Sequence, residues 1–314
     1  MSGKFIISLD FEKSWGFNDI IKDESDFEKF VQIDNIVNSI LELFDMYSIS
    51  ATWAVVTGMI KDNEKKYNLE SVIKHREPEF QTSNFISLLK NENINEKTYT
   101  TAIEKLLNNN QEVASHSHTH IYLNDVEIDE SIILEDLKLS NNKIKDITRN
   151  SKQSIVFPRN QITHEIINKL PNLGFSQYRG TNSTISDAVS EEVNIFTKII
   201  RVLDSYVPLM GPSFSIAKLD SVGMVNIPAS RYLRIKSSHS LNLIHLSRVK
   251  AEMTQSAKKM KNYHLWWHPH NFTTNKQSSL YMLNEILKHY EVLKSLYGYE
   301  NATMAEVGRE LNES

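Results

Sequence analysis

The sequence predicts an α/β protein in which short buried strands alternate with amphipathic helices around a parallel sheet. Segments 4–12 and 51–56 are near-continuous apolar runs, as expected of strands covered on both faces. A helical pattern lies between them, with apolar side chains recurring every three or four residues from 30 to 44. With 314 residues, the chain has the length of one barrel-sized domain, which we expect to span residues 1–314.

The alternation of strands and helices continues along the chain. Residues 180–223 interrupt it, because they hold three Pro or Gly residues from 208 to 212 without clear periodicity, and we interpret them as a long active-site loop or lid. Seven strands are expected, at 4–12, 51–56, 113–115, 154–157, 174–179, 224–227 and 264–268. Helices are expected after a capping box at Ser25 and Glu28, and at 130–147, 164–170, 241–259, 279–293 and 303–311.

The composition excludes several functional classes. The net charge is −4 with acids and bases interspersed, so nucleic acid is not an expected partner. The absence of cysteine leaves histidine and carboxylate as the credible metal ligands. No apolar run approaches the ~20 residues of a transmembrane segment, and the run at 5–9 is too short and too close to acids for a signal peptide. These features predict a cytoplasmic protein and leave its oligomeric state open.

The segment 111–123, Q-E-V-A-S-H-S-H-T-H-I-Y-L, carries three histidines in alternation after a short apolar strand. On an extended chain His116 and His120 would lie about 13 Å apart, at ~3.3 Å per residue, which is too far for one ion. If the strand ends near Ser115 and the chain then turns helically, both imidazoles come onto one face and His118 points away. A solitary histidine is usually solvent-facing or hydrogen-bonded in a core, but this alternation favours a metal site.

The first strand ends in two acids, Asp10 and Glu12. They are two positions apart, so on a strand both point to the same side. The carboxyl ends of parallel strands are where barrel enzymes hold their chemistry, so we expect this acid pair to lie beside the histidines. The alternative interpretation is a solvated strand end with a helix cap.

Two later strands also end in polar residues. The strand at 154–157 runs into P-R-N at 158–160, where proline ends the strand and Arg159 can turn inward. The last strand runs into H-L-W-W-H-P-H at 264–270. Its two tryptophans offer flat faces for a sugar ring, although core packing is the more common role.

The chain resembles the polysaccharide deacetylases with the NodB homology domain, a carbohydrate esterase family. The resemblance lies in four motifs: D-x-E on the first strand, H-S-x-x-H-x-x-L on the third, the Pro/Arg corner and the late H-P-H. The resemblance covers residues 5–272. It implies a single distorted (β/α) barrel of about seven strands, with a long insertion near 180–223. It also implies a divalent metal ion, expected to be Zn²⁺, and removal of an N-acetyl group from an amino sugar. A cytoplasmic location would favour a nucleotide- or lipid-linked precursor of a surface polysaccharide as substrate.

The resemblance also implies a set of metal ligands. His116 and His120 match the family's metal-binding pair, with Ser117 in the hydroxyl position. The usual first motif, T-F-D-D, is here S-L-D-F-E. By likeness to members with D-x-D, Asp10 is the expected base and Glu12 the third ligand, and the exchanged assignment stays open.

Two further roles are carried over from the family. Arg159 is the expected orienter of the base, although the motif R-x-P is here P-R-N. His268 is the expected general acid, with His270 as second choice. The family's fourth motif, D-x-x-D-W, is absent, and residues 224–231 are its expected replacement.

Two other classes of function remain open. A metal-dependent hydrolase of small cyclic amides, or a phosphoesterase, would use an H-x-H pair at His116 and His118 and further Asp ligands on later strands. A carbohydrate-binding or scaffolding relative would keep the fold and lose the residues that activate water. Metal analysis distinguishes these possibilities.

Overall fold

The computed structural model describes residues 3–13, 32–60, 93–123, 128–181, 204, 206 and 213–313. Its strands are β1 (Lys4–Phe11), β2 (Thr52–Val55), β3 (Glu112–Ser115), β4 (Gln153–Ile155), β5 (Phe175–Tyr178), β6 (Lys218–Leu219), β7 (Val225–Asn226), β8 (Arg231–Tyr232), β9 (Tyr263–Trp267) and β10 (Glu300–Asn301). Its helices are α2 (Ile33–Met46), α5 (Asn93–Asn108), α6 (Glu130–Thr148), α7 (His164–Ile167), α8 (Leu170–Leu173), α10 (His239–Lys258), α11 (Lys276–Tyr297) and α12 (Met304–Asn312).

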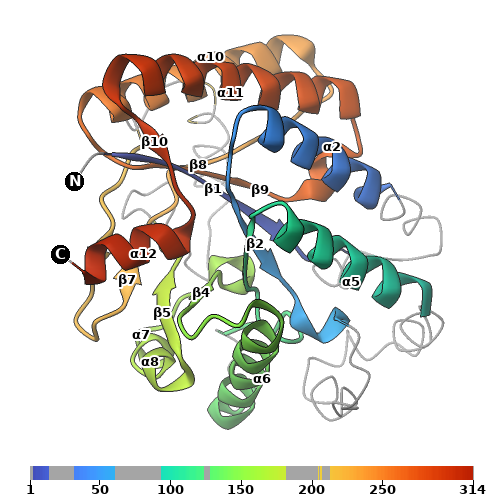
Figure 1. Cartoon of the computed structure of the whole chain (residues 1–314), viewed down its shortest axis with the longest axis vertical. Helices are drawn as coiled ribbons and strands as arrows, with labels where there is room; N and C mark the ends of the chain where they lie inside the picture. Colours follow the sequence, from blue (N-terminus) through green and yellow to red (C-terminus); the bar gives the residue numbers. More distant parts are fainter. Residues whose placement is uncertain are drawn as a thin grey trace.

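The strands form one curled sheet in the order β6-β7-β5-β4-β3-β2-β1-β9-β8, with β10 paired to the start of β1. Within the described residues, every strand pairing is parallel except that of β6 with β7. Figure 1 shows the helices arranged around the outside of this half-barrel. The predicted alternation of strands and helices is confirmed, and all seven expected strands are present. Strands β6, β8 and β10 were not expected, because two residues are too few to show a periodic pattern.

Strand β1 is an interior strand of the sheet, between β2 and β9, and is buried along its whole length. Its odd-numbered side chains, such as Phe5 and Leu9, pack in the main hydrophobic core with the inner faces of α2, α10 and α11. Ile6, on the other face, belongs to a cluster inside the half-barrel. Because side chains alternate along a strand, Asp10 and Glu12 project to this inner side as well.

Helix α12 closes the amino-terminal end of the half-barrel. Its residues Met304 and Val307 pack in the inner cluster. The carboxylate of Glu112, at the start of β3, accepts hydrogen bonds from the backbone N–H of Ala305 and from the Thr52 hydroxyl. Burial raises the pKa of Glu112 despite these bonds. The polar strand ends identified in the sequence therefore lie at the opposite, carboxyl end of the sheet.

Two sequence expectations fall wholly or partly outside the described residues. The capping box at Ser25 and Glu28 is one. Helix α2 begins at Ile33, and its expected apolar face is buried from there through Phe44. The other is the insertion near 180–223. Among its described residues, 213–223 contain β6 and a bridge between Ser215 and Asn262, which precedes β9. Among the helices that the structure describes, none combines the length and apolarity needed to cross a bilayer.

Candidate metal and catalytic site

The chain turns directly after β3, as expected, but the turn is not helical. Ser117 and His120 both adopt left-handed backbone conformations, with φ of 65° and 59°. Asp136 of α6 holds the turn, because its carboxylate accepts hydrogen bonds from the backbone N–H groups of His118 and Thr119 at 2.7 and 2.9 Å. The same carboxylate accepts a bond from the Thr119 hydroxyl. The predicted turn is therefore built by a buried acid that the sequence pattern did not single out.

This turn places His116 and His120 on one face, with ring centroids 5.1 Å apart. Glu12 Oε2 lies 3.1 Å from His116 Nε2 and 2.9 Å from His120 Nε2. Potential ligand atoms of these three buried residues all lie within 4.8 Å of one another. The arrangement of one carboxylate and two imidazoles is one that could hold a divalent metal ion.

Electrostatics within this cluster are strongly coupled. Burial alone would raise the pKa of Glu12, but the imidazoles of His268 and His120, with hydrogen bonds from the cluster histidines, hold it well below its ordinary value. Burial alone would lower the pKa of His116, but the hydrogen bond to Glu12 and the charge of Asp10 raise it. His116 Nδ1 lies 2.9 Å from the Val156 carbonyl oxygen, which only accepts, so Nδ1 carries the proton and Nε2 faces Glu12.

The remaining histidine of the motif, His118, points away from this cluster. Its Nδ1 lies 2.9 Å from the hydroxyl of Thr57, which follows β2. Burial lowers its pKa. The structure therefore does not bring the H-x-H pair together with the acid of β1.

Asp10 is held by an arginine, but not by the one expected. Arg179 Nη1 lies 2.6 Å from Asp10 Oδ1, and Nη2 lies 2.8 Å from Oδ2, which is a bidentate ion pair. Burial alone would raise the pKa of Asp10, but the Arg179 charge, followed by that of His116, holds it below its ordinary value. The expectation for Arg159 is corrected, because its guanidinium lies over the Tyr122 ring, 4.2 Å from the centroid.

The side chain of Arg179 is fully buried at the end of β5. It donates to the amide oxygen of Asn160 from Nε and Nη2, and to the Ser8 hydroxyl from Nη1. Its guanidinium also lies 4.3 Å from the centroid of the Trp266 ring. Arg179 was missed although it is the last residue of an expected strand, because arginines lie near the ends of two neighbouring strands and the sequence does not show which one reaches Asp10.

The backbone explains why Arg159 turns away. Arg159 and Asn160 both adopt left-handed conformations, with φ of 52° and 53°. This corner turns the Asn160 amide toward Arg179 and leaves Arg159 exposed beside Tyr122. The P-R-N corner thus supports the arginine of the next strand.

His268 follows β9 and faces the acids of β1. Its Nε2 lies 3.3 Å from Glu12 Oε1 and 3.8 Å from Asp10 Oδ2. The neighbouring ring of His270 is 4.9 Å away, and its pKa is lowered to about 3, first by burial and then by the charge of His268. The site thus assembles residues from β1, β3, β5 and β9.

The two tryptophans of β9 lie on opposite faces of the sheet. Trp267 is fully buried in the main core, where its ring stacks on Phe272 at 5.7 Å. Trp266 is half-buried on the inner face, beside Arg179. Core packing thus accounts for one tryptophan, while the other borders the site.

Residues 224–231, the expected replacement for the fourth motif, do not lie at this site. Arg231 instead forms a buried ion pair with Glu252 of α10, with Nε and Nη2 at 2.5 and 2.7 Å from the two carboxylate oxygens. The next residue, Tyr232, is the one that reaches His268, with its hydroxyl 3.4 Å from Nδ1. The expectation for residues 224–231 was therefore wrong, although β8, the strand beside β9, does supply a contact to His268 through Tyr232.

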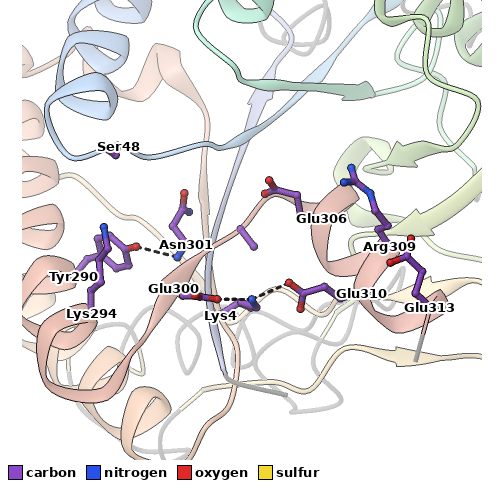
Figure 2. A pocket seen from close by; sticks show the side chains of 11 residues that line it. Lys4, Ser48, Tyr290, Lys294, Glu300, Asn301, Glu306, Arg309, Glu310 and Glu313 are labelled. Atoms are coloured by element: carbon purple, nitrogen blue, oxygen red, sulfur yellow. Dashed lines mark hydrogen bonds and ion pairs between the residues drawn. The ribbon is translucent and has the colours of Figure 1, made fainter.

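A separate cavity lies at the other end of β1. It has a volume of about 460 Å³ and is lined by β10, α12 and Lys4 (Figure 2). Lys4 Nζ lies 2.8 Å from both Glu300 and Glu310. Because Lys4 and Asp10 stand near opposite ends of the same strand, this cavity is distinct from the candidate site.

The comparisons with known proteins agree with this fold. A family model described as polysaccharide deacetylase matches residues 23–178, which include the histidine motif but neither acid of β1 nor His268. A comparison with curated proteins found no match.

Solved structures resemble the whole chain. A Mycobacterium smegmatis protein assigned to the polysaccharide deacetylases has a TM-score of 0.59 at 12% identity, covering 100% of this chain and 92% of its own. A probable polysaccharide deacetylase from Pseudomonas aeruginosa PAO1 has a TM-score of 0.60 at 9% identity, covering 99% of this chain and 91% of its own. PuuE allantoinase has a TM-score of 0.59 at 9% identity, covering 99% of this chain and 90% of its own. At such low sequence identity, the likeness concerns the fold alone. By the match to the family model, residues 23–178 of the chain, which include the histidine motif, belong to the polysaccharide deacetylase family, and the solved structures share the half-barrel fold.

Proposed function

We propose that the protein is a metal-dependent hydrolase that removes the N-acetyl group from an amino sugar. The observation that carries this proposal is the position of two further groups around the Glu12, His116 and His120 cluster. Asp10 and His268 both reach it, with His268 Nε2 3.3 Å from Glu12 Oε1 and 3.8 Å from Asp10 Oδ2. A base and an acid beside a metal site are what hydrolysis of an unactivated amide requires.

The cluster fits a divalent cation, and we propose Zn²⁺ held by Glu12, His116 and His120. Because His116 Nδ1 donates to the Val156 carbonyl, a neutral His116 turns the lone pair of Nε2 toward the Glu12 carboxylate at 3.1 Å. Two facing lone pairs are stabilised only by a proton or a cation between them. The nitrogen and oxygen donors suit zinc, which when bound would polarise the amide carbonyl and lower the pKa of water from 15.7 to about 7.

Asp10 is the proposed general base. Its carboxylate is kept ionised by the bidentate ion pair with Arg179, so it can accept a proton from water at neutral pH. The ion pair also fixes the direction of its oxygens. Glu12 is less suited to this role, because its Oε2 already faces both cluster imidazoles.

His268 is the proposed general acid. When the amide C–N bond breaks, the leaving amine needs a proton, and an imidazolium at His268 can donate it from Nε2. The products are acetate and the free amino sugar. His270 is the weaker candidate, since its lowered pKa, about 3, keeps the ring neutral.

The proposed substrate is an N-acetylated amino sugar, either within a surface polysaccharide or in its nucleotide- or lipid-linked precursor. Membership of the polysaccharide deacetylase family supports the acetylated sugar. The half-buried ring of Trp266, on the inner face of β9, is an aromatic side chain beside the site on which a sugar ring could pack.

The test is acetate release by the zinc-loaded protein from a panel of N-acetylated sugars. The panel contains oligosaccharides, nucleotide-linked sugars and lipid-linked sugars, and a small cyclic amide represents the alternative hydrolase. Acetate release that is lost in Asp10→Asn and on chelation supports the proposal. Opening of the cyclic amide without acetate release would replace it, and sugar binding without turnover of any compound would indicate a carbohydrate-binding relative.

A further inference from the structure

We propose that Tyr232 is a positioning residue for His268, holding its imidazole so that Nε2 faces the two acids of β1. This inference rests on the proposed function, because it concerns the side chain to which the proton donation is assigned. Tyr232 belongs to β8, a two-residue strand that the sequence pattern did not reveal. None of the motifs recognised in the sequence includes it.

The two ring nitrogens of His268 face different groups, Nδ1 the Tyr232 hydroxyl and Nε2 the acids of β1. The Tyr232 hydroxyl lies 3.4 Å from Nδ1, while Nε2 lies 3.3 Å from Glu12 Oε1. The rings of Tyr232 and His268 also contact edge-on, with centroids 5.9 Å apart. A rotation of the imidazole by half a turn would put Cδ2 and Cε1 where Nδ1 and Nε2 now lie and so break both contacts, which means that the hydroxyl selects one ring orientation.

Tyr232 is itself held in place by three independent contacts. In the parallel pairing of β8 with β9, it lies directly opposite Trp266. Its ring meets the Trp266 ring edge-on, with centroids 4.6 Å apart. The side-chain amide of Asn271 donates a hydrogen bond to the Tyr232 hydroxyl oxygen. Because that oxygen already accepts from Asn271, its own proton is available to point at His268 Nδ1.

A hydroxyl group suits a side chain that must gain and lose a proton. It donates to Nδ1 of a neutral imidazole and accepts from Nδ1–H of an imidazolium, so it can hold the ring in both states. A carboxylate at this position could only accept. Burial raises the pKa of Tyr232 to about 12, so the phenol keeps its proton at neutral pH.

The same contacts connect the acid side of the site to the base side. Trp266 packs against Tyr232 on β8 and against the guanidinium of Arg179, which lies 4.3 Å from the Trp266 ring centroid. Arg179 holds Asp10. A single side chain of β9 therefore supports both the residue that holds the base and the residue that holds the acid.

The first test compares Tyr232→Phe with Tyr47→Phe. Tyr47 is a matched control, because it is also half-buried and its hydroxyl donates to an asparagine, Asn284, beside α2. We expect Tyr232→Phe to lower kcat about tenfold with KM and metal content unchanged, and Tyr47→Phe to leave kcat unchanged. In a His268→Ala background, Tyr232→Phe should cost no further activity, because its effect passes through His268. An equal loss in both backgrounds would overturn the inference.

The second test does not depend on turnover. In protein labelled with ¹⁵N-histidine, the shifts of His268 at alkaline pH should show mainly the Nε2–H tautomer. Tyr232→Phe should give a mixture of tautomers, whereas Tyr47→Phe should not. An unchanged His268 spectrum in Tyr232→Phe overturns the positioning role. If the spectrum changes but wild-type protein releases no acetate from any sugar, the positioning role stands and the proposed function fails.

Discussion

Arg179 holds Asp10 through two parallel hydrogen bonds, Nη1 to Oδ1 at 2.6 Å and Nη2 to Oδ2 at 2.8 Å, with both side chains buried. A planar guanidinium makes such a pair, whereas an ammonium group cannot reproduce it. We therefore expect Arg179→Lys to fold but to lose about 10²-fold in kcat, because the charge remains and the orientation of Asp10 is lost. The measurement is steady-state turnover, with circular dichroism to confirm folding.

Arg159→Lys is the control for this substitution, because Arg159 is the arginine that the sequence motif assigned to the base. Its guanidinium packs on Tyr122 and does not pair with Asp10. Its kcat should stay within about threefold of the wild-type value. If Arg159→Lys loses more turnover than Arg179→Lys, the corrected assignment is wrong.

The two acids of β1 should separate in their effects. Asp10→Asn should retain the metal and lower turnover by roughly 10²–10⁴-fold, the usual contribution of a positioned base. Glu12→Gln should instead weaken metal affinity, because Glu12 Oε2 faces both cluster imidazoles. Metal content by mass spectrometry and turnover, measured on the same samples, test both statements. Loss of the ion in Asp10→Asn and not in Glu12→Gln would show that the roles are exchanged.

The histidines of the 116–120 motif should differ in metal binding. His116→Ala combined with His120→Ala should abolish binding of one divalent ion, since both imidazoles leave the cluster. His118→Ala should keep the ion, because its Nδ1 contacts Thr57 and not Glu12. Calorimetric titration with Zn²⁺ gives the stoichiometry, and retention of the ion by the double variant would refute this ligand set.

Replacement of His268 should change the pH–rate profile. A general acid must be protonated when the amine leaves, so wild-type activity should fall on the alkaline side. His268→Ala should lose that limb and retain the metal. His270→Ala should do much less, since burial and His268 lower the pKa of His270 to about 3 and its ring stays neutral. A near-normal rate with an unchanged alkaline limb in His268→Ala would assign the proton donor elsewhere.

His264 should make folding sensitive to acid. It is fully buried, and burial, followed by the charge of Arg179, lowers its pKa from 6.5 to about 3. Between these values the unfolded chain binds a proton that the folded protein excludes, so stability falls as the pH drops from 6.5 toward 3. This group adds at most about 1.4 kcal/mol per pH unit to the slope. Urea unfolding of His264→Gln should show a shallower slope than the wild type, and equal slopes would count against this explanation.

Local sequence patterns were sufficient for the elements of the fold. The buried run of β1, the apolar face of α2 and the helix expected at 303–311 each depend on residues close together in the chain, and the structure confirms each of them. The turn after β3 was predictable for the same reason, because two imidazoles four residues apart can meet only if the chain curls. The two-residue period of β1 also placed Asp10 and Glu12 on one side of the sheet.

The partners of these residues were decided by the tertiary structure. Arg159 and Arg179 both follow neighbouring strands, but Arg179 comes directly after β5 and pairs with Asp10, whereas the left-handed corner at 159–160 turns Arg159 away from it. Tyr232 meets His268 because β8 pairs with β9 in one register, and a two-residue strand leaves no periodic signal in the sequence. Local periodicity determines which side of a strand a residue takes. Contacts between distant segments depend instead on sheet order and register, which arise from packing of the whole chain.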